Sequence, residues 1–173
     1  MTGRPLRVAM IGTRGVPATF GGIEHHVEEL GARLAARGHE ITVYCRSNYV
    51  ERAVRTHRGM ALRRLPTVST KSFDAIVHSA LATADAVGRR YDVIHYHALG
   101  PGLVAPAARF GSRACVVQTI HGRDDQRAKW RGLARTALHL AGWMSARVPD
   151  ATIVVSKDLA RYYAERYLSL IHI

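Results

Sequence analysis

The stretch VAMIGTRGVPATFGGIEHHVEEL, residues 8–30, decides the fold of this chain. It begins within a short apolar run, Leu6–Ile11, of the kind that forms a buried strand in a parallel sheet. A glycine-rich loop follows, and apolar residues at helical spacing then predict a helix from Ile23 to Arg37. Gly38 stands where the end of a helix favours a left-handed residue. This order of strand, loop and helix indicates the opening unit of an α/β sheet.

Gly21 and Gly22 directly precede the predicted helix. Residues without side chains let a ligand approach the backbone closely, and the free N–H groups at the start of a helix attract anions. A phosphate or diphosphate would fit such a position. The alternative is that the glycines only make the turn from strand to helix, which a unit of this kind needs in any case. From the glycines alone, both interpretations stay open.

Strands and helices continue to alternate along the chain. Further strands are predicted at Glu40–Cys45, Met60–Leu65, Asp92–His97, Ala114–Ile120 and Asp150–Ser156. Helices are predicted at Phe73–Arg89, in a short apolar segment ending at Arg109, in the amphipathic basic segment Arg127–Arg147, and at Lys157–Tyr167. We therefore expect an α/β fold with a doubly wound, mostly parallel Rossmann-like sheet that binds its ligands at the carboxyl ends of the strands.

Length and composition suit one domain with a well-buried core, because the chain has 173 residues and 47% of them are apolar. We expect this domain to span residues 1–167. The apolar segment Leu168–Ile173 follows a polar helix without a turn signal and resembles a translated adapter from sequencing libraries, so we expect it to be a non-native tail.

The cellular compartment is predicted from two features of the sequence. No run of 18 apolar residues is present, and Leu6–Ile11 is too short for a signal peptide, so we expect a cytoplasmic protein. Cys45 and Cys115 fall in predicted buried strands and are expected to be reduced thiols of the core.

The charge balance favours anionic partners. The chain carries 25 basic and 13 acidic residues, a net charge of +12. Such a field attracts nucleotide phosphates, phospholipid head groups or nucleic acid, without choosing between them. A solvated, arginine-rich surface with no specific partner is the alternative.

Histidines mark two of the predicted strand ends. His95 and His97 share one face of a strand, and a third histidine beside them could complete a zinc site. No cysteine or carboxylate stands at matching spacing, and His95 is predicted to be interior, so we expect no metal. His121 is the strongest candidate for substrate binding, because it is a polar residue placed between a buried strand and a glycine. The alternative is a structural cap of the strand end.

Dinucleotide binding is disfavoured by spacing. A Rossmann fingerprint requires G-x-G-x-x-G and an acidic residue closing the second strand. Here Gly12 and Gly15 are three positions apart, and the second strand ends at Arg46.

Four blocks of sequence resemble the N-terminal domain of family 4 glycosyltransferases, in the subgroup that includes rhamnosyltransferase-like enzymes. The blocks are GTRGVPATFGGIE at 12–24, VEEL at 27–30, RGHEITVYCR at 37–46 and RAKW at 127–130. The resemblance implies the GT-B architecture, in which two Rossmann-like domains face each other across a cleft. It also implies transfer of a sugar from a nucleotide-diphosphate donor with retention of configuration and with no metal or other cofactor.

The resemblance also assigns roles to residues of this chain. Gly21 and Gly22 would lie against the diphosphate of the donor, and His121 would contact the transferred sugar as the catalytic residue. The acceptor side would be lined by Thr13, Arg14, Lys71, His97, Arg127 and Lys129. The acceptor would be a glycan or a lipid-linked molecule of polysaccharide assembly. The basic segment Arg127–Arg147 would then contact the inner face of an anionic membrane, unless it simply packs on the sheet.

The C-terminal donor-binding domain of such an enzyme is absent from this sequence. That domain would neutralise the leaving diphosphate, so we expect little or no sugar transfer by this chain alone. The alternative is a non-catalytic basic Rossmann-like module that binds phosphorylated ligands or nucleic acid. The sequence lacks the interleaved aromatic and basic residues of single-strand platforms, so no nucleic-acid partner is expected.

Overall fold

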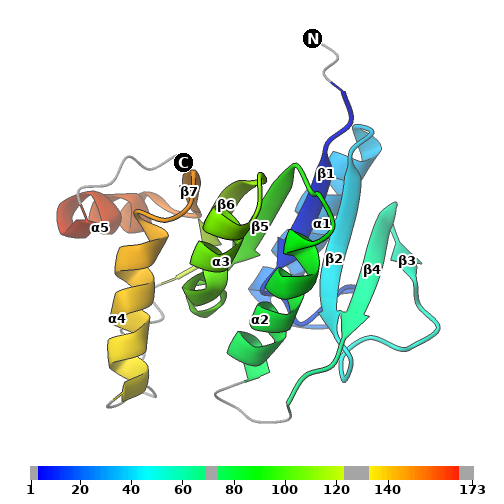
Figure 1. The fold of residues 1–173 in the computed structure, drawn as a ribbon, viewed down its shortest axis with the longest axis horizontal. Helices are drawn as coiled ribbons and strands as arrows, with labels where there is room; N and C mark the ends of the chain where they lie inside the picture. The colour runs from blue at the N-terminus through cyan, green and yellow to red at the C-terminus, as the bar shows by residue number, and fades with distance from the viewer. Residues whose placement is uncertain (1–3, 69–73, 123–132, 168–173) are drawn as a thin grey trace.

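The computed structural model describes residues 4–68, 74–122 and 133–167, and these residues form one sheet with helices around it (Figure 1). The strands lie in the order β3-β4-β2-β1-β5-β6-β7. Their bounds are β1 Arg7–Ile11, β2 Glu40–Arg46, β3 Thr56–His57, β4 Met60–Leu65, β5 Val93–His97, β6 Cys115–Ile120 and β7 Ala151–Val154. The helices are α1 Gly22–Ala36, α2 Asp74–Val87, the 3₁₀ helix η1 Gly100–Val104, α3 Ala105–Gly111, α4 Leu133–Ser145 and α5 Lys157–Tyr167. Every pairing in the sheet is parallel except that of β3 with β4. The predicted doubly wound sheet is thereby confirmed.

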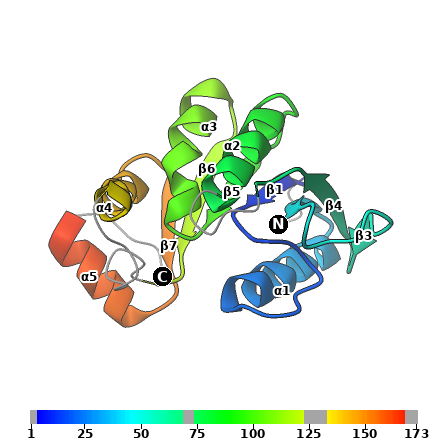
Figure 2. The same ribbon diagram turned by 90° about the horizontal axis from the view of Figure 1, so that it is seen from below.

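The central strand β1 shows how the two faces of the sheet are covered. Val8 and Met10 point to one face, where they pack with Val27 of α1. Ala9 and Ile11 point to the other face, where they join small residues of α2 and α3. Figure 2 shows α1 on the side of the sheet opposite to α2 and α3. Because β1 is buried on both faces, it consists of a continuous apolar run rather than an alternating one.

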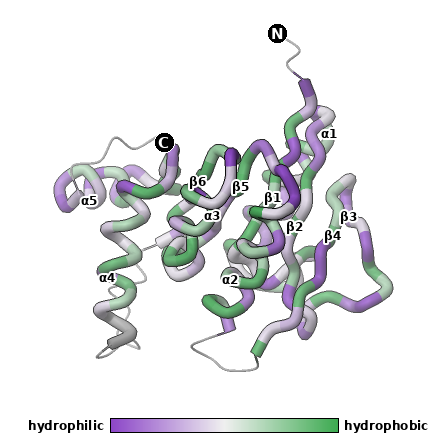
Figure 3. The backbone as a smooth tube through the Cα atoms, viewed as in Figure 1, coloured by the Kyte–Doolittle hydropathy of each residue, from purple (hydrophilic) through white to green (hydrophobic). Residues whose placement is uncertain are grey.

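A third apolar cluster lies beyond β7, at the far end of the sheet. Leu138 and Ala141 of α4 pack there with Val154 of β7 and with Tyr163 and Tyr167 of α5. In Figure 3 hydrophobic and hydrophilic residues alternate along α4 and α5, as expected for helices that bury one stripe only. Ser156 caps the start of α5, since the backbone N–H of Leu159 donates to its hydroxyl at 3.2 Å.

Two details differ from the sequence predictions. The region before β4 contains a short strand, β3, which turns back onto β4 through Arg58 and Gly59, both at positive φ (47° and 80°). Arginine is uncommon in such a turn, so the hairpin gave no sequence signal. The prediction that Cys115 is buried is wrong, because its side chain is exposed. Cys115 begins β6, whereas pairing with β7 begins only at Val117, so β7 does not pair with the strand beside Cys115.

Asp85 of α2 joins the helix to two strands. Tyr44 of β2 donates its hydroxyl to Asp85 (2.7 Å), and the guanidinium of Arg63 on β4 donates to both carboxylate oxygens at 2.5 Å. Arg89 adds a third donor at 2.7 Å. Partial burial alone would raise the pKa of Asp85, but these donors outweigh it and lower the pKa to about 2.

We expect Asp85→Asn to lower the free energy of unfolding by about 1–2 kcal/mol at pH 7. The native carboxyl has a pKa below its unfolded value of 3.8, so its contribution is present above about pH 4 and is lost as the pH falls towards 2. Urea unfolding of wild type and variant between pH 3 and 7 measures this difference. Glu51→Gln, at an exposed carboxylate, is the control. A loss of stability that does not shrink below pH 4 would contradict the assignment.

Candidate active site at the carboxyl edge of the sheet

The loop that leaves β1 passes very close to the end of β5. Gly12 has a φ of +111°, and a Cβ placed on it would lie 2.3 Å from the carbonyl oxygen of His97. No side chain fits in that space, and L residues rarely adopt that φ. Glycine at position 12 therefore allows the end of β1 to meet the end of β5, where the strand order reverses direction and α/β proteins bind their ligands.

The same loop is attached to the start of α1 by buried polar groups. Thr13 is 1% exposed, and its hydroxyl accepts a hydrogen bond from the backbone of Gly15 at 3.3 Å. The backbone N–H of Arg14 donates to the carboxylate of Glu24, a buried residue in the first turn of α1 (3.2 Å). The Arg14 side chain itself is exposed, with its guanidinium carbon 4.9 Å from the ring centre of Phe20. The side chain of Arg14 is therefore an exposed cation at this edge of the sheet, whereas Thr13 holds the loop in shape.

Gly21 and Gly22 stand at the start of α1, and the local backbone requires glycine only at position 21. Gly21 is the N-cap residue and has a φ of 96°, and a Cβ there would lie 2.1 Å from a carboxylate oxygen of Glu24. The turn therefore accounts for Gly21. Gly22 is already helical, and a Cβ on it would meet nothing within 4 Å. Nothing in the described residues requires glycine at 22, and its presence leaves the start of the helix uncovered for a ligand.

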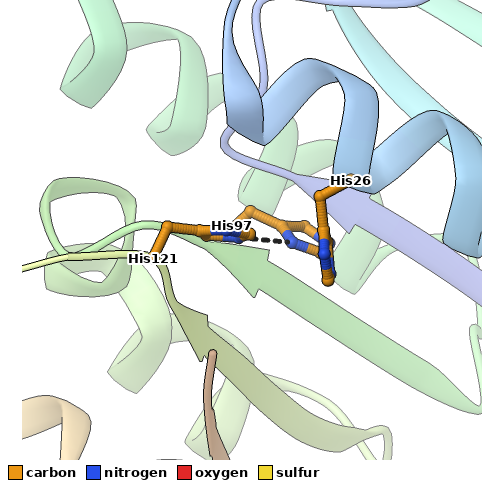
Figure 4. Close-up of side chains that lie close together, drawn as sticks. All are labelled: His26, His97 and His121. Atoms are coloured by element: carbon orange, nitrogen blue, oxygen red, sulfur yellow. Dashed lines mark hydrogen bonds between the residues drawn. The ribbon is translucent and has the colours of Figure 1, made fainter. Parts of the chain in front are cut away.

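Three histidines from separate elements come together beside this helix start (Figure 4). His97 ends β5 and is fully buried, His121 follows β6, and His26 lies on α1. Nδ1 of His97 is 3.4 Å from Nε2 of His121. The ring centroid of His26 lies 4.7 Å from that of His121 and 5.8 Å from that of His97. His26 is four residues after Gly22, so both lie on the same side of α1.

The register of the sheet explains why the histidines meet. Met10, which packs towards α1, is the neighbour of His95 on β5, and His97 is the neighbour of Thr119 on β6. His97 lies two residues after His95, and His121 lies two residues after Thr119. Both side chains therefore point to the same face of the sheet as Met10. His95 is 6% exposed and 2.7 Å from the Thr119 hydroxyl, which confirms the prediction that it is interior.

All four of these histidines are uncharged at neutral pH. Burial lowers the pKa of His121 to about 4, with a smaller contribution from His26. Burial likewise lowers the pKa of His95 to about 3, and holds that of His97 well below its usual value. The pKa of His26 is lowered by burial as well. The cluster therefore offers neutral imidazole nitrogens, which can accept or donate hydrogen bonds or bind a metal.

Not every predicted site residue can be placed. The structure brings Gly21, Gly22, Thr13, Arg14, His97 and His121 to one edge of the sheet. Lys71, Arg127 and Lys129 lie outside the described residues. Sequence reasoning missed His26, because its position one helical turn after Gly22 does not show which face of the sheet α1 covers.

Arg46, at the end of β2, is a further residue that the sequence did not identify as part of the site. Its side chain is 9% exposed and forms an ion pair with Asp74 of α2. Its backbone N–H donates to the carbonyl of Arg14 at 2.8 Å. Arg46 therefore places a second, buried cation next to the loop that follows β1.

Two hollows in the surface of the described residues lie away from this edge. One lies between α2 and the η1–α3 region and is lined by small apolar residues such as Ala80 and Val104. Another is lined largely by arginines, among them Arg55 and Arg64. Neither contains a residue predicted to bind substrate.

Comparison with protein families identifies this domain. The family model for Glycosyltransferase Family 4 matches residues 20–172, and the chain belongs to that family. A search of curated protein sequences finds no match.

Solved structures share the fold at low sequence identity. Sucrose-phosphate synthase from Thermosynechococcus elongatus aligns with a TM-score of 0.71 at 20% identity, over 95% of this chain and 45% of that protein. HepE from Anabaena, in complex with UDP and glucose, aligns with a TM-score of 0.63 at 16% identity, over 92% of this chain and 41% of that one. UGT89C1 from Arabidopsis thaliana, complexed with UDP-L-rhamnose, aligns with a TM-score of 0.61 at 12% identity, over 95% of this chain and 46% of that one. The chain thus has the Rossmann-like fold of GT-B glycosyltransferases and spans less than half of each of these proteins.

No helix in the described ranges combines the length and the apolar character needed to cross a bilayer.

We expect Gly12→Ala to lower the free energy of unfolding by about 3 kcal/mol or more, because the new methyl group adds a clash with the His97 carbonyl to the strain of positive φ. Gly38→Ala is the matched control. Gly38 has a φ of +89° but open space around its Cβ position, so only strain of about 1–2 kcal/mol is expected. Urea unfolding measures both variants. Equal losses of unfolding free energy in the two variants would show that the clash with the His97 carbonyl adds nothing to the cost of positive φ.

Proposed function

We propose that this chain is the acceptor-side half of a retaining glycosyltransferase that takes a sugar from a nucleotide-diphosphate donor and passes it to a glycan or lipid-linked acceptor. It works in polysaccharide assembly in the cytoplasm, at the inner face of the membrane. The observation that carries the proposal is that His26, one helical turn after Gly22, contacts His121. In a family 4 domain, this arrangement supports a donor site that combines the start of α1 with a group able to bind a sugar hydroxyl.

The donor diphosphate is assigned to Gly21 and Gly22. The N-terminus of a helix of 15 residues carries free N–H groups and a partial positive charge, both of which favour phosphate. Gly22 adds no side chain to the approach, and Arg14 is an exposed cation nearby. The UDP bound by HepE and the UDP-L-rhamnose bound by UGT89C1 are donors or products of the proposed class.

His121 is assigned to the transferred sugar. Its pKa of about 4 makes it a neutral imidazole at pH 7, so it acts through hydrogen bonding and not as a charged acid. A neutral ring can hold a sugar hydroxyl in place while charge develops at the reacting carbon. His97, which is covered by its surroundings, is a positioning residue that contacts His121 through Nδ1.

The acceptor side is assigned to the other predicted residues, which are Thr13, Arg14, Lys71, Arg127 and Lys129, with His97 acting behind them through His121. Among the described ones, Arg14 is exposed and is suited to contact an acceptor directly. Thr13 is buried and would act by holding the loop in shape. The reaction uses no metal in this scheme.

In this scheme activity also needs a second, donor-binding domain. Support comes from the solved GT-B structures, of which the chain covers 41–46%. The largest electrostatic demand of the reaction is at the leaving diphosphate, and that demand would be met by cations of the second domain. The chain alone is therefore inactive.

The proposed activity is tested with the chain itself and with a longer protein in which residues 1–167 are followed by a donor-binding domain. We expect nucleotide release from a nucleotide-sugar by the longer protein and none by the chain. His121→Ala in the longer protein should reduce kcat/KM roughly 100-fold. His25→Ala, an exposed neighbour on the same helix, should leave activity unchanged. Robust turnover by the chain alone, or an unaffected His121→Ala enzyme, would refute the corresponding assignment.

Gly22→Ala separates ligand approach from folding. The added methyl group meets no protein atom, so thermal stability should be unchanged or raised by up to about 1 kcal/mol. If the diphosphate lies against this backbone, the methyl group disturbs a charged hydrogen bond, and kcat/KM for the donor should fall roughly tenfold or more. Steady-state kinetics and thermal unfolding of the longer protein measure the two effects. Unchanged kinetics would remove Gly22 from the donor site.

The alternative, a basic module for phosphorylated ligands or nucleic acid, rests on the net charge alone. Part of that charge is already paired within the fold, since Arg63 and Arg89 both contact Asp85. Salt-sensitive binding of nucleic acid, without any response to nucleotide-sugars, would favour the module over the enzyme.

A further inference from the structure

His26, His97 and His121 have the arrangement of a three-ligand metal site. One ring nitrogen from each residue lies within 4.8 Å of the others. Figure 4 shows the three rings directed towards one another from α1, β5 and the segment after β6. The grouping depends on the tertiary fold, because His26 is more than 70 positions away from His97 along the chain.

The distances agree with tetrahedral coordination. Two nitrogens bound at about 2.0–2.1 Å to a tetrahedral zinc ion are about 3.4 Å apart, and the centroids of their imidazole rings are about 5 Å apart. The Nδ1 atom of His97 is 3.4 Å from Nε2 of His121, which is long for a hydrogen bond. The ring centroids of the three histidines are separated by 4.7, 5.7 and 5.8 Å. The ligand nitrogens of the three residues lie within 4.8 Å of one another, so side-chain rotation would have to bring the His26 ring closer to the other two.

The hydrogen bonding of His97 adds a second, independent observation. Its side chain is completely buried, yet within the described residues its Nε2 atom has no hydrogen-bond partner. Its other nitrogen has only the long contact with His121. Buried polar groups are nearly always satisfied, so a buried ring with a single long contact can take a further partner, such as an ion or water, at one of its two nitrogens.

The chemistry of the three ligands selects the kind of ion. Neutral imidazoles suit zinc and other borderline transition metals, whereas Mg²⁺ and Ca²⁺ take oxygen ligands. Structural zinc sites use four protein ligands, while sites with three keep a position open for water or an anion. The ligands stand on the strand β5, directly after the strand β6 and on the long helix α1, and regular elements hold ligands more precisely than loops do.

We propose that His26, His97 and His121 bind one Zn²⁺ or similar divalent transition-metal ion, with a fourth coordination position left for water or an anionic ligand. The proposal does not depend on the glycosyltransferase assignment, because binding requires only the three imidazoles. The nitrogen of His121 that binds the ion cannot hold a sugar hydroxyl at the same time, so the metal-bound form and the metal-free form that transfers sugar are separate states of this site. It replaces the expectation from sequence that no metal site is present, which was made without His26.

The test uses the 173-residue chain without a polyhistidine tag. Isothermal titration with Zn²⁺ at pH 7.5 should show one tight site, and Co²⁺ should give the intense visible absorption of a tetrahedral complex. His26→Ala and His121→Ala should each weaken Zn²⁺ binding roughly 100-fold, since loss of a direct ligand costs at least as much as loss of a residue behind it. His97 is left unchanged because its replacement in the buried interior would affect folding.

His25→Ala is the matched control, since it removes an exposed histidine from the same helix. It should bind Zn²⁺ as the wild type does, and Zn²⁺ should raise the melting temperature of these two proteins but not of His26→Ala or His121→Ala. Circular dichroism checks that the variants are folded. No Zn²⁺ binding at millimolar concentrations, or equal binding by wild type and both ligand variants, would overturn the proposal. Neither result would bear on sugar transfer, which the kinetic test measures separately.

Discussion

The backbone contact between Gly12 and His97 is the constraint on which the candidate site depends. The order of strands reverses at β1, so the loop after β1 and the end of β5 diverge to opposite faces of the sheet. The loop after β1 and the end of β5 can leave the sheet from neighbouring points only if their backbones are in direct contact. The absence of a side chain at Gly12 allows this contact. The histidine that ends β5 is thereby placed below the start of α1, where His26 and His121 meet it.

Much of the fold could be predicted from the sequence because its signals are local. The apolar run of β1, the repeat of Val27 and Leu30 on α1, and Gly38 at the end of that helix each specify an element without knowledge of the rest. The strands β5 and β6 were found to within a residue at each end. Where a local signal was absent or misleading, the prediction failed. The arginine-containing turn before β4 was missed, and the exposure of Cys115 depends on where β7 begins to pair.

The candidate site was predictable only in part, since its residues come from distant parts of the sequence. His97 and His121 could be identified because each ends a strand, and the ends of parallel strands meet at one edge. His26 could not be assigned to them from spacing alone. It reaches the cluster because α1 packs on the same face of the sheet that His95 and His97 share, which follows from the register of Met10 with His95.

One buried carboxylate has a consequence for any ligand at this edge. Glu24 accepts the backbone N–H of Arg14 and lies against Gly21, so a negative charge already occupies part of the space in front of the helix. An incoming phosphate therefore has to share the helix N-terminus with this carboxylate, and the nearby cations Arg14 and Arg46 offset the repulsion. Selectivity at this edge should accordingly depend on the size of the anion as well as its charge. A compact doubly charged group would be repelled by Glu24, whereas an extended diphosphate can place its second phosphate beyond it.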